Sequence, residues 1–222
     1  TFDFDYVFLM SDHGFTRLKA MFSIYQWAIR RGYLRLNSRL VSLLNKLGLL
    51  GSCSTIIKRL LRIIPLRGDG KDLAREASLS LIDWDRSKII PLAEGVIYIN
   101  PTLKRQMSHE EFLEFINRLI LELDSVKDPK TNEKLAKKIY RKEELYSGNY
   151  LDLAPDIVIL PNEGYEIITS FMYGREWNHE PKEKGWSGVH SFYGIFLAYG
   201  EGIKKDTRIC LLYTSPSPRD RG

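Results

Sequence analysis

Residues 5–14 read DYVFLMSDHG, an apolar run that ends in a short polar, glycine-containing segment. A continuous apolar run over residues 6–10 predicts a strand buried on both faces, as in the sheets of α/β proteins. In open α/β sheets, ligands bind beyond the carboxyl ends of the strands. The sequence therefore predicts a core strand at residues 6–10 and a functional loop at residues 11–14.

Helix and strand patterns alternate along the rest of the chain. Helices are predicted at 16–31, 38–47, 54–64 and from Ser108 to about Leu123, where Ser108 and Glu111 match a capping box. Strands are predicted at 88–92, 96–99, 135–140, 156–160, 167–171 and 195–199. This alternation predicts an α/β fold with a mostly parallel sheet flanked by helices. We expect one domain over 1–209, with a helical and strand-containing insertion at about 33–150.

Both ends of the chain suggest a fragment. Thr1 stands almost inside the first strand, whereas a natural terminus usually has some slack before its first core element. Residues 210–220 read CLLYTSPSPRD, which resembles a translated sequencing adapter. We therefore expect an N-terminal part to be missing and 210–222 to be a non-native tail, the alternative being a natural Ser/Pro-rich tail.

Composition narrows the class of protein. The 222 residues carry 33 Lys and Arg against 28 Asp and Glu, and the densest basic stretch, 58–67, alternates with Leu and Ile. This spacing is typical of a solvated helix face, so no nucleic-acid polymer is predicted as a partner. Cys53 and Cys210 fit no metal or disulfide pattern, which favours the cytoplasm. No apolar run approaches the roughly 20 residues that span a bilayer.

Asp12 and His13 are the first candidate metal ligands. A carboxylate and an imidazole both bind Zn²⁺ or Mn²⁺, and Gly14 allows a sharp turn beside them. A turn with a surface histidine explains the same residues. His190 favours the interpretation as metal ligands. It lies just before the predicted strand at 195–199, and His13 lies just after the predicted strand at 6–10. A metal site needs ligands from separate strands, and these two histidines satisfy that requirement.

Other residues are secondary candidates. Asn100 ends a predicted strand and could contact a substrate, although a turn role is the favoured interpretation. His179 lies in a polar loop and could line a pocket or simply face solvent. Trp177 and Trp186 could form an aromatic wall for a leaving group, or pack in the core.

The two histidine motifs carry a family resemblance. A strand followed by Ser-Asp-His-Gly, and later Gly-x-His before IFLAYGEGIK at 195–204, resembles the type I phosphodiesterase and nucleotide pyrophosphatase group of the alkaline phosphatase superfamily. Stretches at 82–84, 95–100, 127–129, 140–148 and 154–158 resemble a microbial branch of phosphohydrolases or phosphomutases. The resemblance covers most of residues 3–204.

The resemblance implies a two-metal hydrolase of phosphate mono- or diesters, with Zn²⁺ or Mn²⁺ as cofactors and a small phosphate ester or nucleotide as substrate. Asp12 and His13 would bind the metal that activates a Thr or Ser nucleophile, and His190 would bind the metal that holds the attacking water. The family places its nucleophile and further ligands before the Ser-Asp-His-Gly strand. No residue here matches them, so no nucleophile is assigned and we expect this chain to be inactive as it stands.

Two alternatives stay open at this point. A phosphomutase or a sulfatase-like member of the same superfamily would use the same metal ligands. A non-catalytic binding or scaffold domain would make Asp12, His13 and His190 ordinary loop residues. The sequence indicates no oligomeric state.

Overall fold

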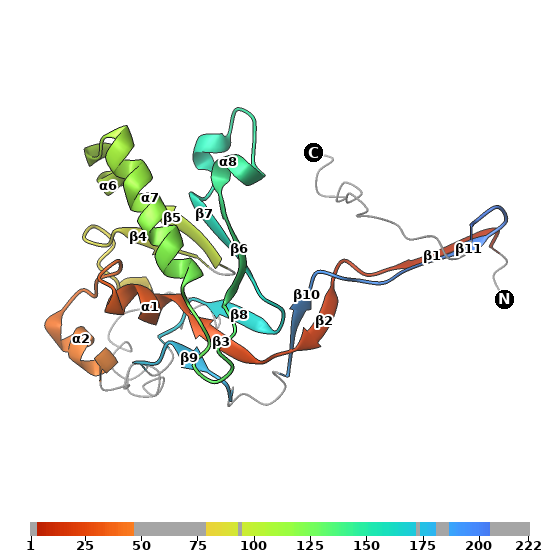
Figure 1. Cartoon of the computed structure of the whole chain (residues 1–222), viewed down its shortest axis with the longest axis horizontal. Helices are drawn as coiled ribbons and strands as arrows, with labels where there is room; N and C mark the ends of the chain where they lie inside the picture. The colour runs from red at the N-terminus through yellow and green to blue at the C-terminus, as the bar shows by residue number, and fades with distance from the viewer. Residues whose placement is uncertain (1–3, 47–78, 93–94, 172–173, 181–186, 205–222) are drawn as a thin grey trace, which may run out of the picture. The chain divides into compact units, whose positions relative to one another are not determined.

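The computed structural model describes residues 4–46, 79–92, 95–171, 174–180 and 187–204 (Figure 1). The chain divides into two compact units, one formed by 1–14 with 192–222 and the other by 15–191. The helix predicted at 54–64, Trp186 and the predicted tail at 210–222 lie outside the described residues. The expected insertion at about 33–150 stays a prediction. Within the described residues, no helix has the length and apolar character that crossing a bilayer requires.

The first unit contains a two-stranded antiparallel ribbon. β1 (Tyr6–Met10) pairs with β11 (Phe196–Gly200), and Phe8 stands opposite Ala198. Both strands were predicted, but the expectation that residues 6–10 are buried is wrong. These residues are 47% to 61% exposed, because no further strand or helix covers the ribbon in the described part of this unit. A two-stranded ribbon alone cannot bury both faces.

The second unit is built around a four-stranded sheet. Its strands lie in the order β4 (Ile89–Pro91), β5 (Val96–Ile99), β7 (Ile157–Pro161) and β6 (Ala136–Arg141). Every pairing in this sheet is antiparallel. The mostly parallel sheet predicted from the alternation of elements is therefore wrong, although the mixed α/β class is confirmed.

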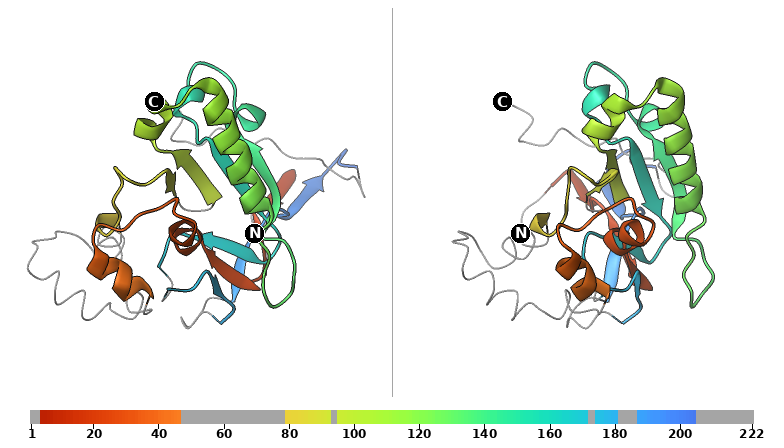
Figure 2. Two further views of the ribbon diagram at one scale, coloured as in Figure 1. Left: turned by 60° about the vertical axis from the view of Figure 1, so that its left-hand side comes forward. Right: turned by 90° about the vertical axis from the view of Figure 1, so that its left-hand side faces the viewer.

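Helix α7 (His109–Asp124) covers this sheet (Figure 2). Phe115, Ile116, Leu119 and Leu123 form its buried side, and they join the buried strand residues in one core. The predicted capping box is confirmed: Ser108 Oγ accepts from the Glu111 N–H at 3.2 Å, and Glu111 accepts from the Ser108 N–H at 2.7 Å. These bonds satisfy backbone donors that the first helical turn leaves unpaired.

Residues 16–31 do not form the single helix that their apolar spacing predicts. They contain the end of β2 (Gly14–Arg17), then β3 (Ala20–Ser23) and α1 (Ile24–Arg30). β3 is buried along its whole length, pairing in parallel with β8 (Tyr165–Ile168) and antiparallel with β9 (Trp177–Asn178). Tertiary pairing has thus overridden the local helical pattern.

The remaining elements are short. β2 pairs with β10 (Gly188–Ser191). Helix α2 (Arg39–Lys46) follows the predicted cap Ser38, whose Oγ accepts from the Val41 N–H at 3.1 Å. The helical turns α6 (Pro101–Gln106), α8 (Lys142–Leu145) and η3 (Leu151–Leu153) complete the described structure.

Gly95 provides a test of the sheet packing. Its φ is +85°, and a Cβ there would lie 2.7 Å from the Ile159 carbonyl oxygen. We expect Gly95→Ala to lower the free energy of unfolding by about 2–4 kcal/mol, from backbone strain and overpacking together. Gly148 has a φ of +101° with nothing within 4 Å of a built Cβ, so Gly148→Ala should cost only about 1–2 kcal/mol. Urea denaturation measures both, and equal losses would contradict the proposed packing.

Candidate functional site

Asp12 and His13 lie in the loop that follows β1, both in the first unit. The backbone N–H of His13 donates to Asp12 Oδ1 at 2.9 Å, which folds the carboxylate back onto its own loop. His13 Nδ1 lies 3.1 Å from the Gly14 carbonyl oxygen. Because a carbonyl only accepts, Nδ1 donates in this contact, and in a neutral ring the lone pair would then stand on Nε2.

That Nε2 atom faces Asp12. It lies 3.4 Å from Asp12 Oδ1, while the side chains of Asp12 and His13 are 86% and 30% exposed. A lone pair next to a carboxylate oxygen is unfavourable unless a proton or a cation lies with them. Two ligands on one tetrahedral Zn²⁺, each at about 2.0–2.1 Å, are themselves roughly 3.3 Å apart. The pair therefore has the chemistry and the spacing of two donors to one divalent cation.

His190 belongs to the second unit, on β10. It is exposed, and its ring meets the Phe15 ring edge-on with centroids 5.4 Å apart. The three predicted metal ligands thus divide between the two units. Among the residues that the structure describes, no three His, Cys, Asp or Glu side chains gather in a way that could hold a metal ion. The two metal positions predicted from them, one at Asp12 and His13 and the other at His190, stay predictions.

Asn100 has a structural role. It is 5% exposed and caps α6, where its Oδ1 accepts from the Thr102 N–H at 2.9 Å. Its Nδ2 donates to the carbonyl oxygens of Trp84 and Ser87, both at 2.7 Å. These bonds tie the β5–α6 junction to the segment before β4. The predicted substrate contact is not tested by them, but most of the amide's bonding capacity is already used.

His179 contacts a carboxylate that the sequence did not single out. Its Nε2 lies 2.6 Å from Oδ1 of Asp128, whose side chain has no exposed surface. The same oxygen accepts from the Lys130 N–H at 2.8 Å, and Oδ2 accepts from the Tyr165 hydroxyl at 3.1 Å. Burial alone would raise the pKa of Asp128, but these three donors outweigh it and leave the pKa below its usual value.

Tyr165 extends this network toward the surface. Its hydroxyl also lies 2.9 Å from Glu133 Oε2, and Lys19 forms an ion pair with that same oxygen at 2.7 Å. Burial, helped by the hydrogen bonds to Glu133 and Asp128, raises the pKa of Tyr165 well above its usual value. The hydroxyl therefore stays protonated, and its single proton can be donated to either of the two carboxylates, Asp128 or Glu133.

The Asp128–His179 pair anchors the segment after β9 to the turn after α7. Trp177 stacks on the His179 ring, with centroids 6.2 Å apart and an interplanar angle of 19°. A carboxylate-oriented imidazole can also act as a general base, but only if its other nitrogen meets a reacting group. No described side chain bonds to Nδ1 of His179, so the contacts support anchoring rather than chemistry.

Comparison with known proteins identifies the family to which the chain is similar. A family model described as type I phosphodiesterase / nucleotide pyrophosphatase matches residues 2–190. This range includes Asp12, His13 and His190, and the match confirms the resemblance inferred from the sequence. No curated protein and no solved structure matches the chain.

Asp128→Asn tests the buried network. The substitution keeps the shape but removes the charge, so we expect it to lower the free energy of unfolding at neutral pH by about 2–4 kcal/mol. Because the folded-state pKa of Asp128 lies below its usual 3.8, its stabilisation is present above that pH and is lost as the pH falls through the folded-state pKa. The difference between wild type and variant should therefore shrink in acid.

Urea unfolding over a pH series measures this difference. Asp124→Asn is the matched control, because Asp124 pairs with Lys134 at 2.6 Å while both side chains are about half exposed. Its loss should stay within about 1 kcal/mol at any pH. A loss for Asp128→Asn that does not change with pH would refute the assigned role of the charge.

Proposed function

The chain belongs to the type I phosphodiesterase / nucleotide pyrophosphatase family, and from this premise we propose that it carries metal-binding residues of a hydrolase acting on phosphate mono- or diesters. The family places it among phosphoester hydrolases. The substrate class in the proposal is a small phosphate ester or a nucleotide.

One observation carries the metal part of the proposal. His13 Nε2 and Asp12 Oδ1 are 3.4 Å apart, a separation that suits two ligands of one cation. The contact of His13 Nδ1 with the Gly14 carbonyl oxygen favours the tautomer that presents Nε2 to a metal, in the way that outer-shell acceptors commonly do. Asp12 and His13 would bind one ion, and His190 would contribute to the other.

In this proposal Zn²⁺ or Mn²⁺ would stabilise, as a Lewis acid, the negative charge that develops on the phosphoryl oxygens. The protein's own residues position the proposed metal ligands. Gly14 orients the His13 ring, the His13 backbone N–H orients the Asp12 carboxylate, and Phe15 packs against His190. No nucleophile is assigned among the residues of this chain.

Metal binding tests the ligands directly. We expect Asp12→Ala and His190→Ala each to weaken Zn²⁺ or Mn²⁺ binding by at least about tenfold, because even outer-shell changes at metal sites have effects of that size. His109→Ala is the matched control, because His109 is exposed in the first turn of α7 and belongs to neither motif. Isothermal titration calorimetry gives the affinities. Unchanged binding in both ligand variants would refute the site and favour a scaffold role.

Activity tests the reaction class. In the protein expressed from its complete natural reading frame, Asp12→Ala should lower kcat/KM for bis(p-nitrophenyl) phosphate by at least about a hundredfold. His109→Ala should leave it unchanged. Preferential hydrolysis of p-nitrophenyl sulfate would instead identify a sulfatase-like member.

A further inference from the structure

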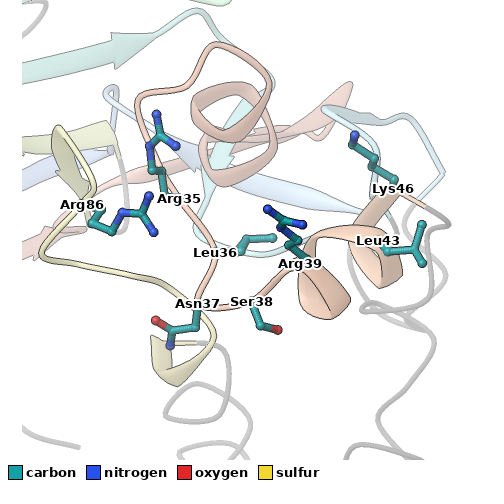
Figure 3. A pocket seen from close by; sticks show the side chains of 8 residues that line it. All are labelled: Arg35, Leu36, Asn37, Ser38, Arg39, Leu43, Lys46 and Arg86. Atoms are coloured by element: carbon teal, nitrogen blue, oxygen red, sulfur yellow. The ribbon is translucent and has the colours of Figure 1, made fainter.

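A cationic cavity lies beside α2 in the second unit (Figure 3). Its volume is about 570 Å³, which falls within the range of roughly 300–1,000 Å³ typical of small-molecule sites. The lining contains four cations, two neutral polar residues and two leucines: Arg35, Arg39, Lys46, Arg86, Asn37, Ser38, Leu36 and Leu43. No residue of the proposed metal site contributes to it.

The charge of this cavity is poorly compensated. Among the residues that the structure describes, no carboxylate lines it, and Arg86 forms an ion pair with Asp83 at 3.8 Å. Arg35, Arg39 and Lys46 form no ion pair within the described part of the chain. Within the described part of the chain, the four cations have one ion-paired carboxylate between them, which leaves an excess of three positive charges. Like charges around one concave surface repel one another and attract a polyanion.

The backbone holds two of these arginines in place. The Arg35 carbonyl oxygen accepts from the Asp83 N–H at 2.9 Å, and the Arg35 N–H donates to Ser87 Oγ at 3.0 Å. The Arg86 N–H donates to Asp83 Oδ1 at 3.1 Å. Arg35 and Arg86 thus come from adjacent segments joined by hydrogen bonds. An anion binding between them would not need to order the backbone first.

The start of α2 adds a second feature that favours an anion. Ser38 and Arg39 line the cavity where the helix begins, and the first turn of α2 contains no acidic residue. A helix N-terminus carries a partial positive charge, so a basic residue there is unfavourable on its own. A bound anion would relieve that repulsion and accept hydrogen bonds from the arginines.

We propose that this cavity binds a ligand carrying two or more phosphate groups. Arg35, Arg39, Lys46 and Arg86 bind the phosphates, while Leu36 and Leu43 provide an apolar wall for the rest of the ligand. The phosphates can belong to a soluble polyphosphate or nucleotide, or to a phosphorylated lipid headgroup. Binding here needs no divalent metal, so it is independent of the proposed hydrolase site.

Calorimetric titration of the whole chain with tripolyphosphate, at low salt and with a chelator present, tests this site. We expect Arg35→Glu combined with Arg39→Glu to weaken binding by at least about tenfold. The double variant should fold, because both side chains are exposed and a glutamate suits the first turn of a helix. Circular dichroism checks this.

The matched control is Arg105→Glu combined with Lys137→Glu. Both residues are exposed, lie outside the cavity and give the same change in net charge. Binding should change by less than about twofold in this control. Equal weakening in both double variants would overturn the proposal, because it would show general electrostatic attraction only. Loss of tripolyphosphate binding in His190→Ala would also overturn it, since the ligand would then depend on the other site.

Vesicle binding distinguishes the two sources of phosphate. Vesicles of phosphatidylcholine alone are compared with vesicles that also contain a phosphoinositide phosphorylated on its ring. Cavity-dependent binding of the phosphoinositide vesicles but not of tripolyphosphate assigns the site to a lipid headgroup, and the reverse assigns it to a soluble polyphosphate. Absence of both kinds of binding in the wild type overturns the proposal.

Discussion

The fully buried carboxylate of Asp128 holds together several segments at one end of the second unit. Asp128 can stay charged only because its neighbours replace the hydrogen bonds of water. Its donors come from three places in the chain: Lys130 in its own turn, Tyr165 on β8 and His179 after β9. The turn after α7, the parallel strand β8 and the segment leading toward β10 are thereby joined. Removing any one donor leaves part of a buried charge unsatisfied.

Local signals predicted the elements whose structure depends mainly on local contacts. The capping box at Ser108 and Glu111 places the start of α7, because both hydrogen bonds lie within one turn. The β4–β5 pair follows from two apolar runs separated by a short turn. Strand direction could not be predicted in this way. β5 pairs with β7 about sixty residues later, and an alternating pattern of helices and strands does not specify whether such a distant pairing is parallel or antiparallel.

The candidate site was predictable to the same extent. Adjacent residues such as Asp12 and His13 are visible as a motif, and the structure adds the contact of His13 Nδ1 with the Gly14 carbonyl oxygen and the separation of the two side chains. Asp128 was not recognisable as a buried ion-pair partner, because Asp128-Pro129 has the composition of an ordinary surface turn. The cavity beside α2 was equally hidden, since Arg35 and Arg86 become neighbours only through tertiary hydrogen bonds.

The exposure of Asp12 limits how tightly Asp12 and His13 alone can bind a metal ion. With 86% of its side chain exposed, any cation bound to Asp12 and His13 would keep much of its water, and water competes well for divalent ions. Catalytic zinc sites generally use three protein ligands and structural ones four. The apolar ribbon that carries this loop is likewise uncovered on both faces in the described unit. Tight binding of one ion at Asp12 and His13 therefore requires at least one further protein donor, and the proposed pair of residues alone would give only weak affinity.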